Sequence, residues 1–316
     1  ALYSQQWGFT GTHGMRVPGA WDRTTGSGAT VAVIDTGITS HPDLDRNVVP
    51  GYDFISNSAA ARDGGGRDSN PRDEGDWYAA GECGTAGASD SSWHGTHVAG
   101  TVAAVADSRG VVGVAPNAKI QPIRVLGKCG GSLSDIADAV VWAAGGTVAG
   151  VPANPNPADV INMSLGGSGT CGTTYQNAIN AAVSRGVPVV VAAGNENQPA
   201  ANVRPANCRN TIVVAASTSQ GARASFSNYG SAVDVTAPGA NIISTVNNGA
   251  TTPTTAGHAA YNGTSMATPH VAGLAALLLA ERPSLTPAQV ESTLRSTARS
   301  MPCLLYTSDA ADEEDS

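Results

Sequence analysis

Short runs of apolar residues alternate along the chain with longer segments in which apolar positions recur at helical spacing. The runs are rich in valine and isoleucine with little polar alternation, which is typical of parallel strands covered on both faces. They predict strands at residues 30–34, 119–125, 160–164, 188–192, 211–215 and 233–236. The intervening and later segments predict helices at residues 94–104, 133–144, 174–185, 268–280 and 286–298. This alternation predicts one doubly wound α/β domain with helices on both faces, whose ligands bind beyond the carboxyl ends of the strands.

A long loop rich in aspartate, glycine and asparagine interrupts the alternation at residues 56–92. Loops of this length commonly serve a function or hold an ion. Calcium takes six to eight oxygen ligands, and glycines let backbone carbonyls turn inward toward it. The ligand spacing differs from that of an EF-hand, and composition alone favours a solvated acidic loop over a calcium site.

The composition is that of a globular protein, with 41% hydrophobic residues, 13% charged residues and a formal net charge of −8. The 38 glycines and 18 prolines predict many tight turns. The absence of a lysine- and arginine-rich stripe argues against nucleic-acid binding. The longest apolar helical run, residues 271–280, is too short to cross a membrane. Because the chain begins at Ala1 with no leader peptide, we expect a processed mature form.

Five cysteines are present, none in a CxxC pair, which argues against a zinc ribbon or a redox motif. Four of them, Cys83, Cys129, Cys171 and Cys208, allow three ways of forming two disulfides, of which 83–129 with 171–208 is one. Disulfides would imply an oxidising compartment. Isolated buried thiols are the alternative, and spacing alone does not separate the two.

Three short segments carry residues that are typical of hydrolytic chemistry. Asp35 ends a predicted strand in VAVIDTG, His94 and His97 begin a predicted helix in HGTHVAG, and Ser265 precedes another helix in NGTSMATPH. Taken singly, Asp35 is typical of a turn and Ser265 of a helix N-cap. His94 and His97 have the spacing of ligands on one helix face, but no glutamate lies between them as in the zinc-protease motif. Together the segments supply a nucleophile, a base and a group that orients the base.

All three segments resemble those of the subtilisin-like serine proteases, in the same order of aspartate, histidine and serine. The similarity runs over residues 21–299, and GTSMATPHVAG at residues 263–273 is a long and specific motif. It is strongest to the bacterial extracellular branch with added disulfides and a long acidic loop. The resemblance implies a three-layer subtilisin-like α/β fold and a secreted serine endopeptidase.

The resemblance also assigns roles in catalysis. Ser265 would attack the scissile carbonyl, His94 would take and return its proton, and Asp35 would hold the histidine tautomer. Asn195 ends the segment VVVAAGN and resembles the family's oxyanion asparagine. In subtilisin, loss of that donor costs about 10²–10³ in turnover.

A substrate cleft is implied in the same way. Residues 126–131 resemble the edge strand that pairs with an extended substrate, and residues 164–167 resemble the facing edge. Small uncharged walls between residues 164–167 and 192–194 predict an S1 pocket for large apolar or aromatic P1 side chains. The predicted substrate-binding residues are Leu126, Gly127, Gly130, Gly131, Ser164, Leu165, Gly166, Ala192 and Gly194.

Subtilisin-like proteases commonly bind structural Ca²⁺ in surface loops, and the segment His41-Pro-Asp43-Leu resembles one that supplies a ligand. The predicted calcium ligands are Asp43, Asp63, Asp68, Asp73 and Glu74. By the same resemblance, a Cys83–Cys129 disulfide would fix the long loop beside the substrate edge. A Cys171–Cys208 disulfide would fix a second loop near the S1 wall.

Residues 303–316 depart from the family, and their run CLLYTSDAADE resembles the translation of a transposase sequencing adapter. We therefore expect residues 1–302 to form a C-terminally truncated catalytic domain and residues 303–316 to be a non-native, adapter-derived tail. A natural acidic C-terminus is the alternative.

The expected partners are polypeptide substrates and, in a precursor, the chain's own inhibitory propeptide. We expect an extracellular monomer that binds neither nucleic acid nor membrane. The alternatives are an inactive truncated fragment and a non-catalytic binding protein on the same fold. A lipase or amidase is disfavoured because Ala267 stands where the Gly-x-Ser-x-Gly elbow has its second glycine.

Overall fold

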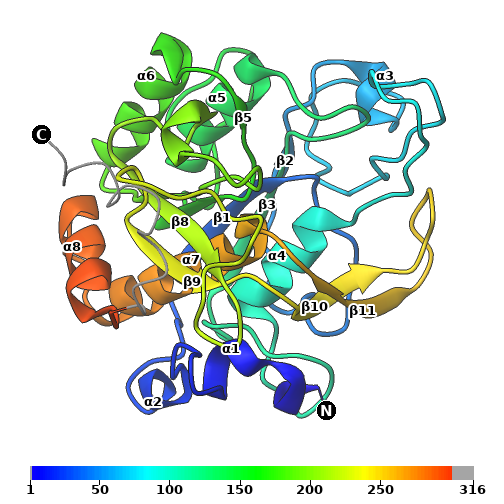
Figure 1. Ribbon diagram of the computed structural model, residues 1–316. Helices are drawn as coiled ribbons and strands as arrows, with labels where there is room; N and C mark the ends of the chain where they lie inside the picture. The colour runs from blue at the N-terminus through cyan, green and yellow to red at the C-terminus, as the bar shows by residue number, and fades with distance from the viewer. Residues whose placement is uncertain (1, 301–316) are drawn as a thin grey trace, which may run out of the picture.

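Seven strands form one sheet in the order β2-β3-β1-β4-β6-β8-β9, and every neighbouring pair runs parallel (Figure 1). The computed structural model describes residues 2–300. The strands are β1 (Thr30–Asp35), β2 (Tyr52–Asp53), β3 (Lys119–Arg124), β4 (Val160–Met163), β6 (Val189–Ala192), β8 (Thr211–Ser217) and β9 (Val235–Pro238). All six predicted strands are confirmed, and the two-residue β2 is the one strand of this sheet that was not predicted.

Strand β1 lies where the strand order reverses. It pairs with β3 on one side and with β4 on the other, so the chain departs in both directions from it. The crevice beyond the carboxyl end of such a strand is where open α/β sheets bind ligands. Asp35, the last residue of β1, therefore lies at this crevice.

Helices cover both faces of the sheet and give the predicted three layers (Figure 1). Val31 and Val33 pack on one side, whereas Ala32 and Ile34 pack on the other, as the alternation of a strand requires. The first side carries α4 (His94–Ala103), α7 (Thr264–Glu281) and α8 (Pro287–Thr297), and the second carries α5 (Leu133–Ala143) and α6 (Gly172–Val183). Two separate apolar cores result.

Helix α7 begins four residues earlier than the predicted start at residue 268. The first turn was not predicted, because Thr264 and Ser265 are polar and do not continue the apolar pattern. Ser265 is therefore the second residue of the helix rather than a cap before it. Its side chain lies beside the unpaired backbone N–H groups of the first turn.

Several small elements lie outside the predicted pattern. An antiparallel hairpin of β10 (Ile242–Asn247) and β11 (Ala256–Tyr261) lies beside α4 and was not predicted. A second antiparallel pair joins β5 (Gly167–Ser168) to β7 (Val203–Arg204). The short helices are η1 (Tyr3–Gln5), α1 (Trp7–Thr10), α2 (Pro18–Trp21), α3 (Ser58–Ala61) and η2 (Ala200–Asn202).

Two disulfides join Cys83 to Cys129 and Cys171 to Cys208, the pairing that the resemblance implied. The first ties the long loop to the turn after β3. A fully buried ion pair also anchors this loop region: Arg124 Nη1 lies 2.7 Å from Asp53 Oδ2, and Nη2 donates to the carbonyl of Ala61 at 2.5 Å. Apart from α3, residues 56–92 form no helix or named strand, as predicted.

No helix within residues 2–300 is both long and apolar enough to traverse a bilayer. The predicted adapter-derived tail at residues 303–316 lies outside the described residues.

Candidate active site

Asp35 and His94 form a hydrogen-bonded pair at the switch point of the sheet. Asp35 is fully buried at the end of β1, and its Oδ1 lies 2.8 Å from Nδ1 of His94, the first residue of α4. The backbone N–H of Thr36 donates to the same oxygen at 2.8 Å. Burial opposes a charge on His94, but the adjacent carboxylate of Asp35 outweighs it and raises the pKa of His94 above its ordinary value.

Ser265 enters the same region from α7. Its Oγ donates to the carbonyl of Ser164 at 3.1 Å, and the Ser164 hydroxyl donates back to the Ser265 carbonyl at 2.8 Å. This reciprocal pair fixes the start of α7 against the carboxyl end of β4. Asp35, His94 and Ser265 thus stand on three elements that end or begin at one edge of the sheet.

Asn195 lies just beyond β6 and is exposed. Its side-chain oxygen accepts hydrogen bonds from the backbone N–H of Thr264 at 2.8 Å and from the Thr264 hydroxyl at 3.0 Å. With its oxygen engaged, the amide NH₂ is the group left to donate. Asn195 is therefore bonded to the residue directly before Ser265.

A cleft of about 620 Å³ opens beside this site. His94 and Thr36 line it together with seven of the nine predicted substrate-binding residues: Leu126, Gly127, Gly130, Gly131, Ser164, Leu165 and Gly166. Its other lining residues include Leu133, Ile136, Tyr175, Asp76 and Arg204. Sequence analysis missed these five because they come from separate helices, strands and loops that only the fold brings together.

The two remaining predicted residues, Ala192 and Gly194, do not line this cleft. Ala192 is buried in β6. Gly194 has a φ of +102°, and a Cβ there would lie 2.2 Å from Asn228 Nδ2. The glycine is thus required by the turn that carries Asn195.

Residues 126–131 form a tight turn rather than the predicted edge strand. Gly127 and Gly130 exchange both backbone hydrogen bonds at 3.0 Å, and Cys129 and Gly130 adopt positive φ values of 66° and 96°. Two of its glycines are required by this geometry, since Gly130 has a positive φ and a Cβ on Gly127 would lie 2.3 Å from the carbonyl oxygen of Ala60. Gly130 and Gly131 remain exposed beside the cleft.

The five predicted calcium ligands do not converge on one point. Asp73 is buried, accepts from the Thr36 hydroxyl at 2.6 Å, and has its pKa raised to about 7 by burial. Glu74 lies 3.4 Å from Arg72. Asp63 Oδ1 and Asp68 Oδ2 flank the same glycine, since each lies 3.8 Å from the position of a Cβ on Gly65.

Asp43, the fifth predicted ligand, lies with His41 and His258 in a group of three side chains that could hold a metal ion. Among residues 2–300 this is the one group of at least three histidine, cysteine or acidic side chains with that geometry. Sequence analysis named His41 only as part of the segment around Asp43, and it missed His258 because that residue is 215 positions from Asp43.

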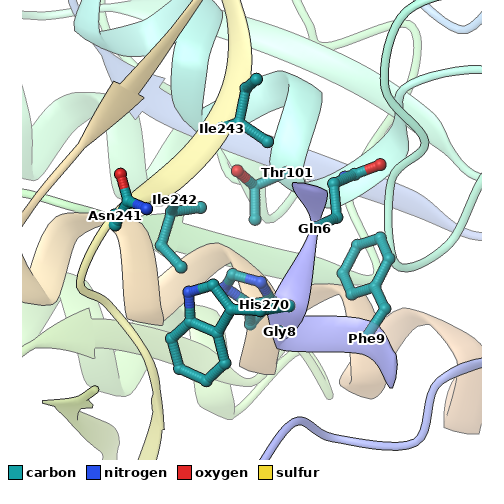
Figure 2. A pocket seen from close by; sticks show the side chains of 9 residues that line it. Gln6, Gly8, Phe9, Thr101, Asn241, Ile242, Ile243 and His270 are labelled. Carbon is teal, nitrogen blue, oxygen red and sulfur yellow. The ribbon is translucent and has the colours of Figure 1, made fainter. Parts of the chain in front are cut away.

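His97 and His270, which lie in the same two motifs as His94 and Ser265, are buried in the core. His97 turns away from His94, places Nε2 2.9 Å from the carbonyl of Ile242, and stacks on Tyr261 at 4.4 Å. Burial lowers the pKa of His97 to about 3 and that of His270 to about 4. Figure 2 shows His270 facing Gly8, with Phe9 close by, in a pocket of about 10 Å³, too small for a ligand.

Comparison with known proteins gives matches over nearly the whole chain. A family model described as Peptidase_S8, subtilase family, matches residues 26–315. An "Extracellular protease" of Xanthomonas campestris is 64% identical, covering 95% of this chain and 52% of its own. An "Extracellular basic protease" of Dichelobacter nodosus is 50% identical over 94% of this chain and 51% of its own. "Subtilisin Savinase" of Lederbergia lenta is 40% identical over 91% of this chain and 90% of its own.

A solved structure of a protease from Pseudoalteromonas arctica superimposes with a TM-score of 0.93 at 57% identity, covering 95% of this chain and 92% of that one. The chain spans about half the length of the Xanthomonas and Dichelobacter relatives.

Proposed function

Because the chain belongs to the subtilase family, we propose that it is a secreted serine endopeptidase that cleaves polypeptides through an acyl-enzyme. The observation that carries the proposal is the hydrogen bond between buried Asp35 and His94 at the mouth of a cleft. A buried carboxylate on Nδ1 leaves the other imidazole nitrogen as the base.

The reaction assigns one role to each residue. Ser265 Oγ attacks the scissile carbonyl while His94 Nε2 takes its proton and then returns it to the leaving amine. Asp35 stabilises the imidazolium that forms in between. The NH₂ of Asn195 and the first-turn N–H of Ser265 donate to the oxyanion, where the N-terminus of α7 also favours negative charge.

In this structure Ser265 Oγ donates to the Ser164 carbonyl. Catalytic hydrogen bonds are commonly longer or differently directed before substrate binds. A substrate backbone that pairs with residues 164–167 would compete with Ser265 Oγ for the Ser164 carbonyl. Ser265 Oγ would then rotate toward His94.

The cleft favours large apolar or aromatic side chains at P1. Its lining includes Leu133, Ile136, Leu165 and Tyr175. Asp76 is the one carboxylate among the described lining residues, and both its oxygens accept from Ser92, at 2.6 and 2.7 Å. With this carboxylate engaged, a basic P1 side chain finds no ready partner.

Structural calcium fits the segment from Asp63 to Asp68. Two carboxylate oxygens flank the open point beside Gly65, and hard oxygen donors with flexible glycines are what Ca²⁺ prefers. The ion would tie this loop together and would take no part in the reaction.

Export and partners complete the proposal. Two disulfides and two similar proteins named as extracellular support an oxidising, extracellular setting. Polypeptides are the substrates, and an inhibitory propeptide and a monomeric state remain predictions.

Hydrolysis of peptide anilides that differ only at P1 tests the proposal. We expect cleavage with Phe or Leu at P1, at least tenfold faster than with Lys. Ser265→Ala should abolish cleavage, whereas the matched Ser184→Ala, an exposed serine after α6, should not change it. A folded protein that cleaves none of these would instead support the binding-protein alternative.

A further inference from the structure

Asn228 is a fully buried asparagine in the segment between β8 and β9, and it does not line the substrate cleft. The hydroxyl of Ser227 fixes it to the sheet. That hydroxyl accepts from the backbone N–H of Ala216 in β8 at 2.9 Å and donates to the carbonyl of Asn228 at 3.0 Å. A buried amide side chain needs partners for both of its N–H groups and for its oxygen.

The side chain of Asn228 finds all of these partners in the turn after β6. Its Nδ2 donates to the carbonyl of Ala193 at 2.9 Å and to Glu196 Oε2 at 2.8 Å. Its Oδ1 accepts from the backbone N–H of Glu196 at 3.1 Å and of Gln198 at 3.0 Å. The full hydrogen-bonding capacity of the Asn228 amide is therefore spent within residues 193–198.

Asn195 lies in the middle of this turn. Before it, the carbonyl of Gly194 accepts from the backbone N–H of Asn228 at 3.0 Å. After it, Glu196 Oε2, which Asn228 holds, accepts from the backbone N–H of Asn195 at 3.0 Å. Asn228 therefore bonds the chain on both sides of Asn195, while Thr264 bonds the oxygen of the Asn195 side chain.

We propose that Asn228 is a positioning residue that holds Asn195 in the oxyanion hole, an inference that rests on the proposed protease function. An oxyanion donor lowers the barrier only if it is already directed at the point where charge develops. A displacement of about 1 Å can cost about 10²-fold in rate. Asn228 contacts neither substrate nor reacting atoms and acts through the turn that carries Asn195.

The kinetics of Asn228→Ala, alone and combined with Asn195→Ala, test this role. Alone, the change should lower kcat by at least about tenfold, but by less than the 10²–10³ expected for loss of the Asn195 donor itself, with little change in KM. Combined with Asn195→Ala, it should cause little further loss, because the donor that it positions is already absent. Asn228→Ser keeps one hydrogen-bonding group and replaces the alanine variant if that one does not fold.

Asn47→Ala is the matched control, since Asn47 is also buried and its Nδ2 donates to the carbonyls of Ala103 at 2.9 Å and Pro116 at 2.7 Å, far along the chain from Asn195. It should lose stability and keep the parent's kcat. An equal fall in kcat for Asn228→Ala with and without Asn195, or the same fall in Asn47→Ala, would overturn the positioning role.

NMR of the Ser265→Ala protein tests the same contact without any need for activity. Backbone order parameters at residues 194–197 should be about 0.85 in the parent and should fall toward about 0.6 with Asn228→Ala, but not with Asn47→Ala. Unchanged order parameters, together with an unchanged side-chain amide resonance of Asn195, would overturn the inference. A parent protein that cleaves no peptide would instead contradict the proposed function, and the NMR result would still decide whether Asn228 holds Asn195.

Discussion

The hydrogen bond between Asp35 and His94 sets the protonation behaviour of the site. Asp35 raises the pKa of His94, whereas burial opposes the charged ring. Activity that depends on neutral His94 should therefore fall as pH drops through this raised pKa.

Replacing Asp35 with Asn removes the main group that raises the pKa of His94, and leaves burial opposed only by the smaller contributions of Asp76 and Asp73. We expect turnover to fall by about 10⁴-fold, since the tautomer is no longer held. The acid limb of kcat/KM should move to lower pH, because the group that raised the pKa is gone. A pH profile of anilide hydrolysis measures both, and an acid limb that stays in place would show that Asp35 does not act on His94.

Asn195 offers a second test at this scale. Asn195→Ala should lower kcat by about 10²–10³, as for the corresponding donor in subtilisin, with little change in KM because the oxyanion forms only after attack. Thr264 should still start α7, since its hydroxyl can bond elsewhere. Steady-state kinetics should be compared with those of the control Asn197→Ala, which changes a nearby exposed asparagine. Equal losses of kcat in the two variants would contradict the assignment of Asn195 to the oxyanion hole.

Single residues were predictable where a short, continuous stretch of sequence forms the motif. Asp35, His94 and Ser265 each stand in a distinctive segment, whereas the partners of Asp43 come from a hairpin 215 positions away. No local pattern marks such a contact. The acidic residues of the long loop were instead predicted to lie together, because they are close in sequence. The fold separates Asp73 from Asp63 and Asp68.

Among the elements, the buried parallel strands were the most predictable, since burial on both faces imposes an apolar run. Residues 126–131 were not, because the same glycines permit an edge strand or a tight turn and only the φ values decide. The β5–β7 pair is too short to give any pattern. The Cys171–Cys208 disulfide joins the segments that follow these two strands.

Removing that disulfide tests its contribution at the scale of the element. Cys171→Ser with Cys208→Ser frees a loop of 37 residues, which should lower the free energy of unfolding by about 3–4 kcal/mol through the entropy of the unfolded chain. KM should rise as well, because Gly167 and Arg204 line the cleft. Denaturant unfolding of the Ser265→Ala protein with and without the pair measures the first effect, and a change below about 1 kcal/mol would contradict it.

At the scale of the whole molecule, α7 carries one residue expected to act in catalysis and another expected to control stability at acid pH. It carries Ser265 at its start and buried His270 one and a half turns later, packed against Gly8 and Phe9 (Figure 2). Burial lowers the pKa of His270 to about 4, below the ordinary value of 6.5. Between these values the unfolded chain binds the extra proton, so stability is retained above pH 6.5 and is lost as pH falls to about 4.

The expected loss from His270 is about 3 kcal/mol over this range. His270→Gln can still donate to the Met266 carbonyl that His270 Nδ1 contacts at 2.8 Å, but it does not titrate. Its stability should therefore fall less steeply between pH 6.5 and 4 in denaturant titrations. An unchanged slope would show that His270 does not carry the acid sensitivity.

Covalent labelling at Ser265 tests the proposed chemistry most directly. Phenylmethylsulfonyl fluoride sulfonylates a serine only where a neighbouring base activates it. We predict one adduct per chain, located on Ser265 by mass spectrometry, with loss of peptidase activity in the same proportion and no adduct in Ser265→Ala. Labelling at another residue, or full activity in the labelled protein, would contradict an acyl-enzyme mechanism built on Asp35, His94 and Ser265.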